Sequence, residues 1–272
     1  MKLKEYLRGK LNEKELEFVP GSYDIVGDIA IFNEIPKELI KKEKLIGNSL
    51  LKLHKNIRVV CKKVGKYSGK YRTPKLKVIA GENRKETDHV ENEVRLRLDV
   101  EKVYFSARLG TERQRITDLV KPNENVLVMF SGIGPYTIQI AKKARRVVGI
   151  EINPVAHKYA VINLKLNKVD NAIAIKGDVK KVVPKLKEKF DRIIMPHPTD
   201  AISYLKYAFL VSKGGTMIHM YSFAKEEEFN ITKQNILAEC RKLKKKCRII
   251  KVVKAGEYSP RVHRICTDFT VQ

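Results

Sequence analysis

The sequence predicts an α/β protein with a mostly parallel sheet, preceded by a small α+β domain. Beyond about residue 95, continuous apolar runs of strand length alternate with segments of helical character. This alternation is typical of parallel strands that helices cover on both faces. The last two predicted strands follow each other without a helix, so we expect them to close the sheet as an antiparallel hairpin. We therefore expect an N-terminal domain over residues 1–95 and a larger domain over residues 96–272.

The N-terminal domain combines strand and helix patterns. Apolar and polar residues alternate in 22–32 and 56–64, as in strands with one buried face, and 36–54 has a helical pattern. Residues 51–80 contain ten Lys or Arg residues and no acid, with Tyr67 and Tyr71 among them. Such a strip can follow an RNA backbone while its rings stack on bases. The alternative is a solvated basic hairpin.

The larger domain contains a run of expected strands separated by helices. They are 125–130, 146–151, 172–177, 191–195 and 215–223, followed by the helix-free pair 247–258 and 262–271.

Composition points to a folded protein with an anionic partner. Apolar residues make up 43% of the chain, which supports a substantial core. Lysine and arginine outnumber the acids 56 to 31, giving a formal charge of +25. Nucleic acid is the leading candidate partner for such a charge. A heat-adapted composition is the alternative, but it usually enriches glutamate alongside lysine.

The cysteines and the apolar runs indicate a cytoplasmic protein. The four cysteines are scattered without a CxxC pair, so we expect reduced thiols and no metal site. No apolar run reaches the length of a membrane span, and the first residues lack the apolar core of a signal peptide.

Polar residues and glycines follow three consecutive predicted strands. Gly132 and Gly134 lie in the first turn, where glycine lets the backbone approach a ligand closely. Glu151 ends the second strand, where a carboxylate can accept both ribose hydroxyls of a nucleoside. Asp178 and the backbone of Val179 follow the third strand and can face an adenine. Each acid alone could be a helix N-cap or a surface residue, but the three features together predict a nucleoside site.

A nicotinamide cofactor is the main competitor for this site. It would favour a third glycine for the pyrophosphate, but Tyr136 and Thr137 occupy that region. AdoMet, which has no phosphates, fits better. The helix-free antiparallel ending is typical of the Rossmann-like class I sheet of AdoMet-dependent methyltransferases.

Four segments carry a resemblance to a known family. They are YDIVGDIAIF (23–32), KVYFSARLGTERQRI (102–116), MFSGIGPY (129–136) and IEINPVAHKYAVINLKLNKV (150–169). Together they resemble the archaeal and eukaryotic tRNA guanine-37 N1-methyltransferases and their sister, the wyosine-pathway 4-demethylwyosine aminocarboxypropyltransferase. The likeness covers most of the chain and does not by itself choose between the sisters.

Two departures favour the aminocarboxypropyltransferase. Val128 replaces an aspartate of the methyltransferases, and Met195-Pro196-His197-Pro198 stands where they have Asn-Leu-Pro or Asn-Pro-Pro. We therefore expect transfer of the 3-amino-3-carboxypropyl group from AdoMet to C7 of 4-demethylwyosine at position 37 of tRNA-Phe, releasing methylthioadenosine. The alternatives are guanine-37 N1-methylation and, from another class, a non-catalytic RNA-binding protein.

The resemblance also implies roles for individual residues. Ser106 and Arg113 would hold the methionine end of AdoMet, although a surface salt bridge to Glu112 or a neighbour is the default for Arg113. Arg108 would reach the acceptor base or its phosphate. Phe130 and Pro198 would line the cofactor.

The histidines and the C-terminal basic segment have more than one interpretation. His197 would accept a proton or stack on the acceptor base, unless it only fits a rigid loop between prolines. We expect His157 to be structural and His219 to be a core residue with a satisfied partner. Residues 241–254 contain eight Lys or Arg residues and no acid, and we expect a second basic face along the end of the last helix. We expect a monomer without a covalent enzyme intermediate.

Overall fold

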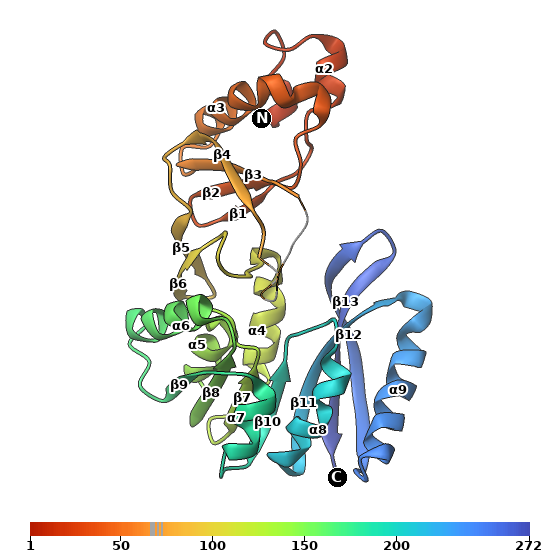
Figure 1. Ribbon diagram of the computed structural model, residues 1–272. Helices are drawn as coiled ribbons and strands as arrows, with labels where there is room; N and C mark the ends of the chain where they lie inside the picture. Colours follow the sequence, from red (N-terminus) through yellow and green to blue (C-terminus); the bar gives the residue numbers. More distant parts are fainter. Residues whose placement is uncertain (66–68, 70, 72) are drawn as a thin grey trace. The chain divides into compact units, whose positions relative to one another are not determined.

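The chain divides by its internal contacts into two compact units, Met1–Ala107 and Arg108–Gln272 (Figure 1). The computed structural model describes residues 1–272 except 66–68, 70 and 72. Tyr67 of the basic strip therefore lies outside the described residues. The contact boundary falls later than residue 95 because the hairpin over residues 86–99 contacts the first unit.

The first unit contains a four-stranded sheet in the order β1-β2-β3-β4 and a separate β5-β6 hairpin. A cluster of aliphatic side chains with Phe32 fills the space between this sheet and its helices. The elements are α1 (Leu3–Tyr6), α2 (Glu13–Glu17), β1 (Asp24–Val26), β2 (Ile29–Phe32), η1 (Lys37–Lys42), α3 (Glu43–Leu53), β3 (Val59–Lys63), β4 (Leu76–Gly81), β5 (Glu86–Glu91) and β6 (Val94–Asp99).

Residues 22–32 form a hairpin rather than the single strand that the alternation indicated. Strands β1 and β2 pair antiparallel, with Val26 opposite Ile29. The chain reverses at Gly27, whose φ of +58° is accessible to glycine at little cost. A Cβ atom at this position would also lie 2.1 Å from Thr87 Oγ1. The turn therefore depends on glycine for both its backbone angle and its packing.

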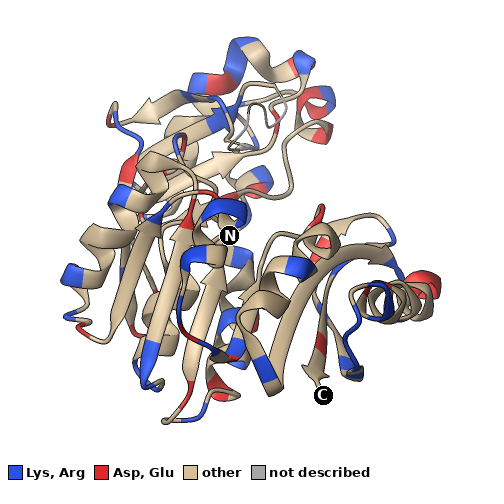
Figure 2. Cartoon of the chain, turned by 60° about the horizontal axis from the view of Figure 1, so that its bottom comes forward, with Lys and Arg blue, Asp and Glu red and all other residues tan. Residues whose placement is uncertain are grey.

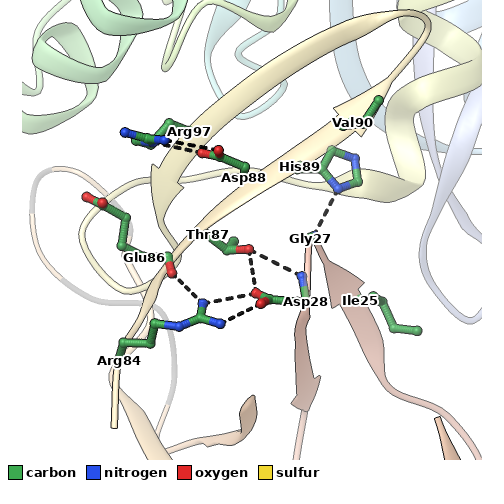
Figure 3. A pocket seen from close by; sticks show the side chains of 10 residues that line it. All are labelled: Ile25, Gly27, Asp28, Arg84, Glu86, Thr87, Asp88, His89, Val90 and Arg97. Atoms are coloured by element: carbon green, nitrogen blue, oxygen red, sulfur yellow. Dashed lines mark hydrogen bonds and ion pairs between the residues drawn. The ribbon is translucent and has the colours of Figure 1, made fainter. Parts of the chain in front are cut away.

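A set of paired charges attaches the β5-β6 hairpin to the β1-β2 turn (Figure 3). Arg84 donates hydrogen bonds from both Nη1 and Nη2 to the carboxylate of Asp28, and Nη1 lies 2.9 Å from Oδ1. Thr87 Oγ1 donates to the same carboxylate at 2.8 Å. The hydrogen bond from Arg84 holds the pKa of Asp28 below its ordinary value, against the opposing effect of burial. In this pocket Asp28 pairs with Arg84 and Asp88 pairs with Arg97, so we interpret it as a structural contact between the hairpin and the turn.

The second unit is built on a seven-stranded sheet in the order β12-β13-β11-β10-β7-β8-β9. Strands β7 to β11 are parallel, and β13 runs antiparallel to both of its neighbours. The strands are β7 (Asn125–Met129), β8 (Arg146–Glu151), β9 (Ala172–Lys176), β10 (Phe190–Met195), β11 (Ser212–Lys225), β12 (Cys247–Ser259) and β13 (Val262–Val271). The predicted strands and the antiparallel ending are thus confirmed, and β11 is longer than expected at both ends.

Helices cover both faces of this sheet. One face packs its apolar side chains against α7, α8 and α9, with Ile193 and Ile218 fully buried between them. On the other face, α5 and α6 contact β8 and β9, and α4 contacts α5. The helical elements are η2 (Ala107–Leu109), α4 (Gly110–Asp118), α5 (Pro135–Ala141), α6 (Pro154–Leu166), α7 (Val179–Val182), η3 (Val183–Lys185), η4 (Ala201–Tyr204), α8 (Leu205–Leu210), η5 (Glu226–Glu228) and α9 (Phe229–Lys242).

The C-terminal basic segment does not follow the last helix as expected. Helix α9 ends at Lys242, and the cations beyond it lie in a turn and on the edge strand β12. The segment leaves the helix because Cys247 begins the ladder with β13. Exposed Arg248, Lys251 and Lys254 line this edge, where charge opposes pairing with another chain. Figure 2 shows cations and acids interspersed over the rest of the chain.

None of the helices that the structure describes has the length and apolar character that crossing a membrane requires. The four cysteines are present as thiols.

Candidate active site

The turn between β7 and α5 brings the backbone to the carboxyl edge of the sheet. Three residues here have positive φ: Phe130 at 59°, Gly132 at 57° and Gly134 at 89°. Such an angle is strained for a phenylalanine and marks a position that the surrounding structure enforces. The N–H of Ser131 donates to Ile150 O at 2.8 Å, which ties the turn to β8.

A glycine on β8 provides the close packing that a third glycine in the turn would otherwise provide. A Cβ atom at Gly149 would lie 2.8 Å from Thr137 Oγ1 and 3.1 Å from Ser131 Cβ. Tyr136 and Thr137 are both buried at the start of α5. The turn is therefore shaped by packing against β8, without the phosphate-binding glycine pattern of a dinucleotide site.

Glu151 at the end of β8 joins two loops through its carboxylate. Oε2 accepts from the N–H of Gly132 at 2.8 Å, and Oε1 accepts from the N–H of Asn153 at 2.6 Å. Burial raises the pKa of Glu151, while these two backbone donors oppose the rise by favouring the charged form. Each carboxylate oxygen has a further lone pair, so the group can also accept from the two hydroxyls of a ribose. The side chain therefore fits the nucleoside end of AdoMet.

Asp178 caps the short helix α7 after β9. Its carboxylate accepts from the N–H of Lys180 at 2.9 Å, as in the N-cap interpretation of this acid. The side chain is half-buried while Val179 is buried. Capping uses one oxygen, and the other oxygen can accept a further hydrogen bond.

The loop after β10 places aromatic rings next to this turn. The His197 ring lies 5.0 Å from the Phe130 ring, between centroids, and Tyr204 meets Phe130 edge-on at 4.8 Å. Lys180 Nζ lies 5.1 Å from the centre of the Tyr204 ring. Pro198 lies half-buried in the same loop. Phe130, His197 and Tyr204 thus form one cluster at the carboxyl ends of β7 and β10.

The remaining expected site residues lie around the start of α4. Arg108 is exposed in η2, just before this helix, whereas Arg113 is buried within it. Glu112, the default partner considered for Arg113, accepts two hydrogen bonds from Arg115 and one from Tyr221. Ser106 belongs to the first unit and is half-buried there.

A buried chain of hydrogen bonds lies beneath the site, on the face of the sheet that α4 covers. Tyr136 and Tyr221 share a hydrogen bond of 2.8 Å, and Tyr221 donates to Glu112 at 2.6 Å. Arg115 connects Glu112 to Asp268, with 2.8 Å between Nη1 and Oδ2. The chain therefore connects α5, which follows the glycine turn, to α4 and to the central strands.

The same series of buried hydrogen bonds continues through His219. Its Nδ1 donates to Asp268 Oδ1 at 2.6 Å, and its Nε2 lies 2.6 Å from Arg192 Nη1. Because arginine can only donate, Nε2 is the acceptor and the imidazole is neutral. Arg192 then pairs with Glu124 through two nitrogens. The prediction of a core histidine with a satisfied partner is confirmed, and His157 likewise bonds the carbonyl of Ala174 at 3.1 Å.

His219, Cys266 and Asp268 place three potential metal ligands within 4.8 Å of one another. Both imidazole nitrogens and both carboxylate oxygens already have protein partners. Two guanidinium groups, those of Arg115 and Arg192, lie next to the cluster and would repel a cation. We therefore interpret it as part of the hydrogen-bond chain.

Comparison with known proteins identifies the family. Residues 87–255 match the model of the TRM5/TYW2 methyltransferase domain, and residues 3–84 match the TYW2 N-terminal domain. The chain belongs to the TRM5/TYW2 methyltransferase family. Its fold is accordingly the class I methyltransferase fold, preceded by the N-terminal domain.

Among its relatives, members named Trm5b have high similarity. The tRNA (guanine(37)-N(1))-methyltransferase Trm5b of Pyrococcus abyssi is 43% identical over 93% of this chain and 76% of its own length. The crystal structure of that Trm5b superposes with a TM-score of 0.87, covering 96% of this chain and 78% of the other. The structure of P. horikoshii TYW2 in complex with MeSAdo has a TM-score of 0.82 and 25% identity, covering 99% of this chain and 97% of the other.

The expectation of aminocarboxypropyl transfer was therefore wrong. It rested on two single positions, whereas similarity over nearly the whole chain places the sequence with the Trm5b proteins. Val128 is fully buried near the carboxyl end of β7, between Gly149 and Ile194 of the neighbouring strands. A single buried position of this kind does not outweigh similarity over nearly the whole chain. His197 does lie at the site, but a loop residue can change while the same group is transferred.

Sequence reasoning missed Tyr204 and the buried hydrogen-bond chain. The signal for Tyr204 was an aromatic residue soon after the fourth loop, at the start of the next helix. The residues of the buried hydrogen-bond chain share no sequence motif, because Arg115 and Asp268 are 153 positions apart in the sequence.

Proposed function

We propose that this chain is an AdoMet-dependent tRNA guanine-37 N1-methyltransferase. The observation that carries the proposal is 43% identity over 93% of the chain to the Trm5b of Pyrococcus abyssi. The Trm5b of Methanocaldococcus jannaschii is also similar, at 37% identity over 92% of the chain. A tRNA substrate agrees with the formal charge of +25 and with the likeness, at a TM-score of 0.86, to the solved complex of aTrm5 and tRNALeu.

In this proposal the carboxyl edge of the second unit holds the cofactor. Glu151 accepts the ribose hydroxyls, Gly132 and Gly134 allow close approach, and Asp178 with the backbone of Val179 faces the adenine. Both oxygens of Glu151 are already aligned by backbone N–H groups, which supports this role. Because the Glu151 carboxylate is already oriented, it loses little conformational entropy when the ribose hydroxyls bind.

The methionine end and the walls of the cofactor site are assigned to three further residues of the second unit. Arg113 holds the methionine end by a charge-assisted pair with its carboxylate. Phe130 and Pro198 line the cofactor. Phe130 is held at a strained backbone angle next to the glycine turn, which supports this position.

The chemistry that AdoMet supplies when bound is an electrophilic methyl group on a positively charged sulfur. Loss of the N1 proton to solvent places negative charge on guanine O6, and N1 then takes the methyl group as the C–S bond breaks and S-adenosylhomocysteine leaves. Arg108 is assigned to donate a hydrogen bond to O6, because its guanidinium is always charged and its side chain is exposed. His197 is assigned to position the base, since its ring already packs against Phe130.

The first unit is assigned to contact the tRNA backbone through the basic strip of residues 51–80. Lys62 and Lys77 both pair with Glu43, so part of the charge of the strip is compensated within the protein. Tyr71 is 38% exposed and remains a candidate for stacking on a base. We further propose a cytoplasmic, monomeric enzyme that accepts tRNA-Phe.

The first test follows two labels from AdoMet into tRNA. One preparation carries the label in the methyl group and the other in the carboxyl carbon. Each is incubated with tRNA that has guanine, adenine or 4-demethylwyosine at position 37. We expect methyl label in the guanine tRNA, none in the adenine control, and no carboxyl label in any tRNA. Absence of methyl label from the guanine tRNA, or carboxyl label in any tRNA, would refute the proposal.

Incubation with the 4-demethylwyosine tRNA tests whether the enzyme methylates a second base besides guanine. The Nanoarchaeum equitans relative at 37% identity is named a tRNA (guanine(37)-N(1))/4-demethylwyosine(37)-methyltransferase. Methyl label in both tRNAs would therefore extend the proposed activity to a second base.

Substitution of His197 tests whether its ring positions the base. We expect His197→Phe to retain kcat/KM within about 3-fold, because the aromatic contact with Phe130 persists. His197→Ala should lower kcat/KM about 10-fold, in line with an aromatic pair worth ~0.5–1.5 kcal/mol. A loss of about 100-fold or more in both variants would instead indicate proton transfer by the imidazole.

A further inference from the structure

The three strands at the C-terminal side of the sheet extend past the site. Strand β10 ends at Met195, which is paired with Met220 of the parallel strand β11. Strand β11 continues to Lys225, paired only with β13, and at ~3.3 Å per residue this adds roughly 16 Å. Because β10 and β11 are parallel, the extension leaves the sheet at the carboxyl edge, where Glu151 and His197 lie. We call residues 222–225, 254–259 and 262–265 the tongue (Figure 1).

The tongue carries a stack of side chains, one from each of its strands. The rings of Phe223 on β11 and Tyr258 on β12 lie 4.0 Å apart between centroids, with 31° between their planes. The guanidinium carbon of Arg264 on β13 lies 5.4 Å from the Phe223 ring centre. Tyr258 is 60% exposed, although it belongs to this stack. The stack therefore presents a preformed aromatic surface to solvent.

Exposed cations lie along one side of this surface. Arg261 is exposed in the turn between β12 and β13, and Arg248 and Lys251 are exposed along the edge strand β12. Lys254 lies on the same strand but pairs with Glu226 at 2.7 Å between Nζ and Oε1. Glu257 is the only acid of the tongue and its turn, and Glu226, Glu227 and Glu228 follow Lys225 directly. The cations available to a ligand are therefore Arg261 and those of β12.

An aromatic surface beside a line of cations matches the chemistry of single-stranded RNA. Bases stack on tyrosine and on arginine planes, and phosphates follow a row of cations. An acidic peptide would use the charges but would have no specific use for the exposed face of an aromatic stack. The tongue also leaves the sheet at the carboxyl edge, the same edge at which Glu151 and His197 lie.

We propose that the tongue is an RNA-stacking platform for the substrate. An unpaired nucleotide of the anticodon loop, other than the one modified, stacks on Tyr258 while its phosphates meet Arg261 and the cations of β12. This inference rests on the proposed function, because it takes tRNA as the substrate.

Replacement of Tyr258 tests the platform directly. We expect Tyr258→Ala to raise both the Kd for tRNA and the KM for tRNA about 10-fold, since stacking contributes ~1–3 kcal/mol per base. The kcat at saturating tRNA and the Kd for AdoMet should stay unchanged. Tyr258→Phe should restore tRNA binding, because it keeps the ring. Ile231→Ala, which removes a 54% exposed apolar side chain from α9, is the matched control and should have no effect.

Two further measurements identify the RNA groups involved. Arg261→Gln should reduce the slope of log Kd against log salt by about one, as expected for the loss of one phosphate contact. Abasic substitutions along the anticodon loop should include one position at which wild type and Tyr258→Ala bind equally. That position would be the stacked nucleotide.

The outcomes separate the platform from the proposed function. Methylation of guanine 37 with a tRNA Kd unaffected by Tyr258→Ala would overturn the platform and leave the function standing. Tyr258-dependent tRNA binding without methylation would support the platform and overturn the function. Absence of tRNA binding by the wild type would overturn both.

Discussion

Asp268→Ala is expected to lower the free energy of unfolding by about 3–5 kcal/mol. Asp268 is 2% exposed and accepts from His219, Arg115 and the thiol of Cys266. Removing it leaves the imidazole N–H of His219 buried without its acceptor, and it leaves the partly buried guanidinium of Arg115 with Glu112 as its carboxylate partner. Breaking a buried pair by removing one partner costs much more than the pair contributes. Urea denaturation of the wild type and the variant measures this difference.

Glu226→Ala is the matched control for this substitution. It also removes a carboxylate that pairs with a cation, Lys254, but both side chains are largely exposed. Exposed pairs contribute little to stability, so the control should unfold close to the wild type. Equal effects of the two substitutions would contradict the structural role of the buried chain.

The same hydrogen-bond chain should make stability sensitive to acid. Burial holds the pKa of His219 below its ordinary value of ~6.5. Below that pH the unfolded chain binds a proton that the folded protein does not, so stability falls as the pH falls. Asp268 acts in the same direction below pH ~4, because hydrogen bonds from His219 and Arg115 outweigh burial and lower its pKa. Urea denaturation at pH 7, 6 and 5 should show this fall, with a shallower slope for His219→Gln; equal slopes would contradict it.

Glu151→Gln is expected to weaken AdoMet binding about 100-fold. The carboxylate is assigned to accept two ribose hydroxyls, and hydrogen bonds to a charged group contribute ~1.5–3 kcal/mol each. The amide has only one oxygen, whereas the N–H groups of Gly132 and Asn153 each need an acceptor. One of these two backbone N–H groups would therefore face the NH2 group of the glutamine. This contact between two donors would also displace the turn between β7 and α5. Isothermal titration with AdoMet measures the loss of affinity.

Glu188→Gln is the control for the loss of a carboxylate near β8. Glu188 pairs with Arg146 at 3.4 Å, at the opposite end of this strand. AdoMet affinity should be unchanged in this variant. If Glu151→Gln bound AdoMet as tightly as the control, the assignment of the ribose to Glu151 would fail.

Much of the fold could be predicted because its strands are continuous apolar runs separated by helical segments. The exception over residues 22–32 is informative, since alternation continued across the turn at Gly27 and gave no sign of two strands. The packing that requires glycine there involves Thr87, which lies far along the chain. In the second unit, the position of Glu151 at the end of β8 could be predicted from the apolar run before it, and parallel strands bring such ends to one edge of the sheet.

The transferred group could not be obtained from the loop residues. Val128 is fully buried near the carboxyl end of β7, and its side chain does not show which group is transferred. The choice between methyl and aminocarboxypropyl depends on which carbon faces the acceptor, and side-chain types do not encode that orientation. Similarity to a Trm5b over 93% of the chain overturned the expectation of aminocarboxypropyl transfer, which rested on Val128 and the loop after β10.

The sequence by itself determined the fold class, the antiparallel ending and the order of polar groups at the strand ends. These features follow from periodicity and from short-range order along the chain, which local physics encodes. Only the tertiary structure decided the buried chain from Tyr136 to Glu124, the cluster of Phe130, His197 and Tyr204, and the stack on the tongue. Each joins residues that the strand order β12-β13-β11-β10-β7-β8-β9 brings together from distant positions, so no local pattern marks them.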